Sequence, residues 1–95
     1  MPVSAVTRKE YDKLKHTRSP HAETAAVEVE WFVADDGAII GALSFDKGSH
    51  DWAFVVLGRD THGHFRAIDL AHGIKARGEA RSQLLAMMER HVATG

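Results

Sequence analysis

The segment Thr24-Ala-Ala-Val-Glu-Val-Glu-Trp-Phe-Val-Ala34 decides the fold that the sequence predicts. Over ten of its positions one set of alternate residues is apolar and the other contains Glu28 and Glu30, a period of two that indicates a half-buried β-strand. Asp35-Asp-Gly37 follows directly and is typical of a hairpin turn, because glycine accepts a positive φ. A second strand over residues 38–45 is therefore predicted to run antiparallel to the first.

Two further strands are expected along the chain, over residues 52–59 and 64–70. They are joined by Asp60-Thr-His-Gly63, which fits a type I turn with Asp at its first position and Gly at its last. The strand over 52–59 is apolar on both faces, which is typical of a central strand that is covered on both sides. One face carries Trp52, Phe54 and Val56, and the other carries Ala53, Val55 and Leu57. Residues 71–78 are expected to be irregular.

Helices are predicted at both ends of the chain. Thr7 and Glu10 have the spacing of a capping box, so a short helix is expected from Thr7 to about Thr17, before Ser19-Pro20. A second helix is expected over Glu79–Val92, since its apolar residues recur with helical spacing. That apolar stripe consists of Ala80, Leu84, Leu85, Met87, Met88 and Val92.

The predicted fold is a single α+β domain over residues 1–95. Its sheet is a four-stranded antiparallel meander in the order 1-2-3-4, because short connections favour neighbouring strands. The C-terminal helix is expected to pack on one face of this sheet, with a short helix at the N-terminus. Residues 1–5 and 93–95 are expected to be loose ends.

The composition excludes several classes of site. The 95 residues contain no cysteine, which removes disulfides, thiol catalysis and cysteine-ligated metals. No signal peptide and no apolar run of membrane-spanning length is recognisable, so a cytoplasmic protein without a membrane partner is expected. The seven histidines would change the net charge from −1 to +6 if all became protonated, within the range where histidine titrates. No cofactor is predicted.

Charge is unevenly distributed along the chain. The balance is +3 over residues 1–22, −6 over 23–72 and +2 over 73–95. The strand region is therefore acidic, and an acidic surface attracts a basic partner. The residues predicted to bind a protein partner are Glu28, Glu30, Trp31, Asp35 and Asp36.

Other functions are less well supported by the sequence. No catalytic motif is present, so an enzyme is not expected. Nucleic-acid binding would use the basic residues Arg8, Lys9, Lys13, Lys15, Lys75, Arg77 and Arg81. A metal- or pH-responsive protein is a third alternative, in which His62 and His64 are the candidate ligands, near the Asp35-Asp36 turn in a meander.

Three runs of the chain resemble a group of small proteobacterial proteins of phage, plasmid or genomic-island type. The runs are WFVADDG (31–37), DWAFVVLGRD (51–60) and GHFRAID (63–69), and the resemblance spans roughly residues 25–90. It implies no known activity and no functional residue. Together with the composition, it favours a non-enzymatic protein-binding module, for example an inhibitor or adaptor that acts on a host defence nuclease such as a CRISPR effector. A homodimer is compatible with each alternative.

Overall fold

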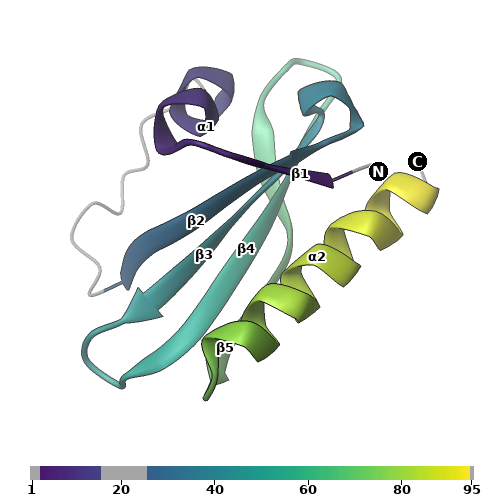
Figure 1. Ribbon diagram of the computed structural model, residues 1–95. Helices are drawn as coiled ribbons and strands as arrows, with labels where there is room; N and C mark the ends of the chain where they lie inside the picture. The colour runs from purple at the N-terminus through teal and green to yellow at the C-terminus, as the bar shows by residue number, and fades with distance from the viewer. Residues whose placement is uncertain (1–2, 16–25, 95) are drawn as a thin grey trace.

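The computed structural model describes residues 3–15 and 26–94 (Figure 1). In chain order, its elements are β1 (Val3–Val6), α1 (Arg8–Lys15), β2 (Ala26–Ala34), the single 3₁₀ turn η1 (Asp35–Gly37), β3 (Ile39–Asp46), β4 (Asp51–Arg59), β5 (Phe65–Ile74) and α2 (Arg77–Thr94). The chain is therefore α+β, with an antiparallel sheet and a C-terminal helix, as the sequence predicts.

The sheet has five strands rather than the predicted four. Its order is β1-β2-β3-β4-β5, and every neighbouring pair is antiparallel. The additional strand is β1, which pairs with the far half of β2 from Val3 opposite Ala34 to Val6 opposite Trp31. Four residues carry too little pattern to predict a strand. Residues 3–5 therefore lie in an ordered edge strand where the sequence predicted a loose end.

The alternation in β2 divides its side chains between two cores. Phe32 faces α2 and Trp31 faces the opposite side, as neighbouring residues of a strand must. The register shifts by one residue between Glu28 and Glu30, so Val29 forms a β-bulge that the sequence did not predict. The described strand begins at Ala26, and the predicted residues 24–25 lie outside the described part of the chain.

The prediction that residues 71–78 are irregular was wrong. β5 continues to Ile74, and α2 begins at Arg77 rather than Glu79. Opposite β4, β5 carries extra residues at two places, between Ala67 and Asp69 and between Ala71 and Ile74. Gly73 lies in the second of these bulges with φ +73°, a conformation that glycine accepts without strain. The glycine that suggested a loop therefore marks a bulge within a strand.

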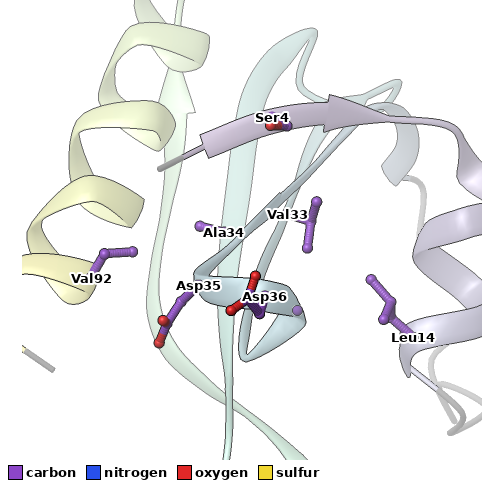
Figure 2. A pocket seen from close by; sticks show the side chains of 8 residues that line it. Ser4, Leu14, Val33, Ala34, Asp35, Asp36 and Val92 are labelled. Atoms are coloured by element: carbon purple, nitrogen blue, oxygen red, sulfur yellow. The ribbon is translucent and has the colours of Figure 1, made fainter. Parts of the chain in front are cut away.

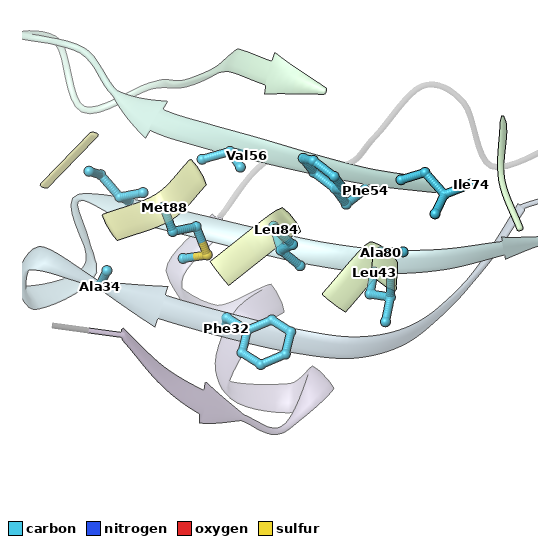
Figure 3. Close-up of a cluster of buried hydrophobic side chains, with 10 residues drawn as sticks. Phe32, Ala34, Leu43, Phe54, Val56, Ile74, Ala80, Leu84 and Met88 are labelled. Atoms are coloured by element: carbon cyan, nitrogen blue, oxygen red, sulfur yellow. The ribbon is translucent and has the colours of Figure 1, made fainter. Parts of the chain in front are cut away.

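The larger core lies between α2 and one face of the sheet (Figure 3). Leu84 and Met88 of α2 are fully buried against Phe32, Leu43 and Val56. Burial of one such side chain contributes about 1.5–3 kcal/mol. This confirms that the C-terminal helix packs on one face of the sheet.

α1 packs on the opposite face, which lies behind the sheet in Figure 3. Glu10 N donates to Thr7 Oγ1 at 3.2 Å and Thr7 N donates to Glu10 Oε1 at 3.4 Å, so the predicted capping box forms. Tyr11 is 1% exposed and packs in a cluster with Ile40 and Ala42, and burial raises the pKa of its hydroxyl. The predicted helix end at residues 16–17 lies outside the described residues.

Candidate functional site

A pocket of about 540 Å³ lies at the η1 end of the sheet (Figure 2). It forms where β1, α1, the β2–η1 hairpin and the last turns of α2 converge. Its apolar lining comes from Leu14, Val33, Ala34 and Val92, and its polar lining comes from Ser4, Asp35 and Asp36, with Gly37 beside them. Segments from both ends of the chain are therefore needed to build it.

Three consecutive residues of the η1 turn have positive φ. The angles are +52° at Asp35, +54° at Asp36 and +90° at Gly37. Aspartate tolerates this left-handed region better than most residues, because its short side chain can bond to nearby backbone. Ala38 N closes the turn on Asp35 O at 3.0 Å. A tight left-handed turn therefore presents two adjacent carboxylates.

Residues of β4 and α1 also contact the η1 turn. Arg59 Nη2 donates to Gly37 O at 3.1 Å, and the guanidinium lies 5.3 Å from the centre of the Phe65 ring. A side chain at position 37 would have its Cβ 3.2 Å from Leu14 Cδ2. Contacts from α1 and β4 thus set the position of the turn relative to the pocket.

The chemistry of the pocket suits an amphipathic cation. Asp35 and Asp36 are exposed at its rim, and the lining beneath them is largely apolar. A lysine or arginine side chain combines an apolar stem with a charged head, so it can fill such a pocket and remain paired. Solvent-exposed carboxylates also steer a basic partner toward the site.

The five residues predicted to bind a partner do not form one surface. Asp35 and Asp36 lie together at the pocket. Glu30 lies on the α2 side of the sheet, where Arg77 Nε and Arg81 Nε donate to its two oxygens at 3.1 and 3.0 Å. Glu28 and Trp31 lie on the other side, where Trp31 Nε1 donates to Glu28 Oε1 at 3.1 Å. The bulge in β2 separates the two glutamates.

The basic residues predicted for nucleic-acid binding are also divided. Arg8, Lys9 and Lys13 are exposed on α1, on one side of the sheet, whereas Arg77 and Arg81 begin α2 on the other. Several of these charges have acidic partners within the chain. Arg8 pairs with Asp12 at 3.5 Å, and Lys75 Nζ pairs with Asp51 Oδ1 at 2.8 Å, an interaction that lowers the pKa of the Asp51 carboxyl. The structure therefore does not unite them into one basic surface.

The two candidate metal ligands, His62 and His64, lie in the β4–β5 turn. Both side chains are exposed, and both backbone N–H groups donate to Asp60 Oδ1, at 2.9 and 3.0 Å. The bond from His64 N is the largest of the interactions that lower the pKa of Asp60, and Arg66 adds an ion pair at 3.1 Å. Asp60 thus organises the turn. Within the described residues, no group of three or more His, Asp and Glu side chains could hold a metal ion.

Sequence reasoning missed five side chains that line the pocket, those of Ser4, Leu14, Val33, Ala34 and Val92. Val33 and Val92 were predicted only as apolar positions of a strand and a helix, and Ser4 was placed in a loose end. No local pattern marks them, because the pocket exists only where β1 and the end of α2 meet the hairpin. The sequence feature that indicated this site was the Asp-Asp-Gly triplet, because these residue types favour turns with positive φ at Asp35 and Asp36.

Comparisons of the chain with protein-family models, curated proteins and solved structures gave no match. Among the described residues, neither helix combines the length and apolar character that crossing a membrane requires. The description of the fold and of the pocket therefore depends on the sequence and structure of this chain alone.

Proposed function

We propose that this chain is a non-enzymatic protein-binding module that captures a basic side chain of its partner in the η1 pocket. The observation that supports the proposal most is the apolar pocket with Asp35 and Asp36 at its rim. The tight turn with positive φ at Asp35, Asp36 and Gly37 supports it further, because it presents the two carboxylates side by side. The acidic balance of residues 23–72 would favour encounter with a basic partner.

Within this class, we place the protein among inhibitors or adaptors encoded by mobile elements. The support is the resemblance of residues 31–37, 51–60 and 63–69 to small proteins of that type. A module that acts by occupying a partner's surface needs a shaped acidic site and no catalytic group. A host nuclease offers a suitable target, because nucleic-acid-binding surfaces are rich in Arg and Lys.

The first test is the double variant Asp35→Asn/Asp36→Asn, which removes both charges and keeps residues that accept a positive φ. Tagged wild-type and variant proteins are used to capture partners from bacterial lysate, and each captured protein is then purified for a binary binding measurement. We expect at least about a tenfold loss of affinity, since a charged hydrogen bond contributes ~1.5–3 kcal/mol.

The matched control is Glu79→Gln/Glu89→Gln, which removes two exposed carboxylates from α2 outside the pocket. This variant should bind as the wild type does. A purified partner that binds both double variants with equal affinity would show that the pocket is not the binding site. Failure of the wild type to bind any protein specifically would refute the proposed function itself.

A further inference from the structure

The two edges of the sheet differ in how they are protected. The sheet ends in β1 on one side and in β5 on the other. An edge strand exposes backbone N–H and C=O groups that a further strand can join, and bulges or charged side chains prevent this. β5 has both, since its register shifts at two places and it carries Arg66, Asp69 and His72. β5 is therefore a protected edge.

β1 has neither kind of protection. The strand reads Val3-Ser-Ala-Val6, without charge or proline, and its register with β2 is regular over all four residues. Ser4 and Ala5 are small and exposed, so another backbone can approach to the strand spacing of about 4.8 Å. Among residues 3–15 and 26–94, β2 alone pairs with β1. The side of β1 that faces away from β2, which we call the β1 edge, is therefore suited to strand addition.

The β1 edge is too short to hold a partner by backbone bonds alone. Four residues offer only a few hydrogen bonds, and each contributes little net free energy in water. A segment that added here would therefore need a second anchor. The η1 pocket supplies one, because Ser4 lines it and stands opposite Val33, another lining residue.

The position of Ser4 determines which residue of an added strand reaches the pocket. Figure 2 shows Ser4 on β1, with Asp36 on the turn across the pocket from it. Side chains directly opposite each other on neighbouring strands project from the same face of the sheet. The residue that pairs with Ser4 would thus project from the pocket side of β1, and the small Ser4 side chain leaves it a path. A long side chain with a cationic end fits, because its apolar stem crosses β1 and its charge ends at the carboxylates.

Charge favours a basic residue at this end of β1 and not at the other. Asp35 and Asp36 follow β2 at the end of β1 where Val3 lies. At the opposite end β1 leads into α1, where Arg8 and Lys9 are exposed. A basic side chain is therefore attracted near Ser4 and repelled beyond the last residue of β1.

We propose that the basic side chain enters the η1 pocket on an extended segment of the partner, which pairs with the β1 edge as a sixth strand and places Lys or Arg opposite Ser4. The inference rests on the proposed function and adds the shape of the partner to it. Backbone bonds select an extended segment over a helix, and the pocket selects its basic residue.

The probe is a capped heptapeptide of alternating threonine and valine in which lysine replaces the central valine. Amide chemical shifts of the full chain measure its binding, and they should change in β1 and η1 but not in β5. Two further peptides carry N-methyl groups, one on the odd-numbered amides and one on the even-numbered amides, because only alternate N–H groups of an added strand face β1. We expect one methylated peptide to bind as the parent does and the other to lose at least about tenfold in affinity.

A matched pair of variants tests the position of the basic residue. Ser4→Lys places a fixed cation in the path to the pocket and should abolish binding of the lysine peptide. Ala5→Lys adds the same charge opposite Phe32, on the α2 side of β1, and should bind the peptide as the wild type does. Both residues are exposed, so both variants should keep the wild-type far-UV circular dichroism.

Four results would overturn the proposal. The first two are equal affinities of the two methylated peptides, and equal binding by Ser4→Lys and Ala5→Lys. The third is a lysine peptide that shifts no β1 amide at any concentration. The fourth is hydrogen exchange in which every β1 amide of the unbound chain is protected, which would show that the β1 edge is already paired within the chain or with a second copy.

The proposed function is judged separately, by the captured partner and the Asp35→Asn/Asp36→Asn variant. A partner that needs both aspartates, together with equal affinities of the two methylated peptides, would retain the η1 pocket as the binding site and reject strand addition.

Discussion

Gly41 is the residue at which the larger core is most tightly constrained. It stands between Phe32 and Val56 on the neighbouring strands, beneath α2. A Cβ at this position would lie 2.8 Å from Met88 Sδ and 2.9 Å from Leu84 Cδ1. Both of these side chains are fully buried, so neither has space to withdraw. The absence of a side chain at position 41 therefore sets the distance between α2 and the sheet.

Gly41→Ala is expected to lower the free energy of unfolding by about 1–3 kcal/mol, because one extra methyl overpacks the core. Urea denaturation measures the change. Gly78→Ala is the matched control, since a Cβ there meets nothing within 4 Å and residue 78 is helical. The free energy of unfolding of this control should rise by about 0.4–1 kcal/mol, because alanine lowers the conformational entropy of the unfolded chain. Equal effects of the two substitutions would contradict this account of Gly41.

At the scale of the element, α1 depends on its cap and on Tyr11. Its eight residues are too few to be helical alone in water. The reciprocal bonds between Thr7 and Glu10 satisfy backbone donors in the first turn, and burial of Tyr11 supplies tertiary contact. Since Leu14 lines the η1 pocket, the cap also influences the proposed binding site.

Thr7→Ala is expected to destabilise the protein by about 1 kcal/mol, because it removes the side-chain oxygen that accepts from Glu10 N. Chemical denaturation measures the loss, and hydrogen exchange at Tyr11 N, which donates to Thr7 O, locates it. Thr7→Ser keeps the hydroxyl and should behave as the wild type. If Thr7→Ser and Thr7→Ala lose the same stability, the capping bond contributes nothing.

At the scale of the whole molecule, one sheet supports two cores. The α2 cluster and the α1 cluster lie on opposite faces of β2, β3 and β4, so neither can form without the strands that the other needs. Trp52 packs at the edge of the first cluster and Trp31 against the second. The two sides should therefore unfold together.

Leu84→Ala is expected to cost about 2–5 kcal/mol, because Leu84 is fully buried between α2 and the sheet. In Trp52→Phe, the remaining tryptophan reports on the face away from Leu84. Adding Leu84→Ala to this background should shift the midpoint seen by Trp31 fluorescence and the midpoint seen by far-UV circular dichroism equally. Separate midpoints would show that the two faces unfold independently.

Features of this fold that depend on neighbouring residues could be predicted, and features that depend on distant ones could not. The β2 strand, the Asp-Asp-Gly turn and the Thr7–Glu10 cap are all local, and the structure confirms them. The strict alternation predicted for β2 was wrong, because the bulge at Val29 places Glu28 and Glu30 on opposite faces of the sheet. β1 was missed because four residues become a strand only by pairing with β2. The last part of β5 was missed because Gly73 reads as a loop residue until its bulge is paired with β4.

The sequence by itself determined that β2 is a strand, where the chain turns after it and that β4 is apolar on both faces, because these properties depend on spacing along the chain. Only the tertiary structure decided which acidic residues are available. Long-range packing tied Glu30 to Arg77 and Arg81, and it left Asp35 and Asp36 at a pocket built from both ends of the chain. The same packing places α2 over one face of β4, whereas α1 covers only part of the other face. A helix can cover one face of a sheet, and a spacing pattern does not say which face stays open.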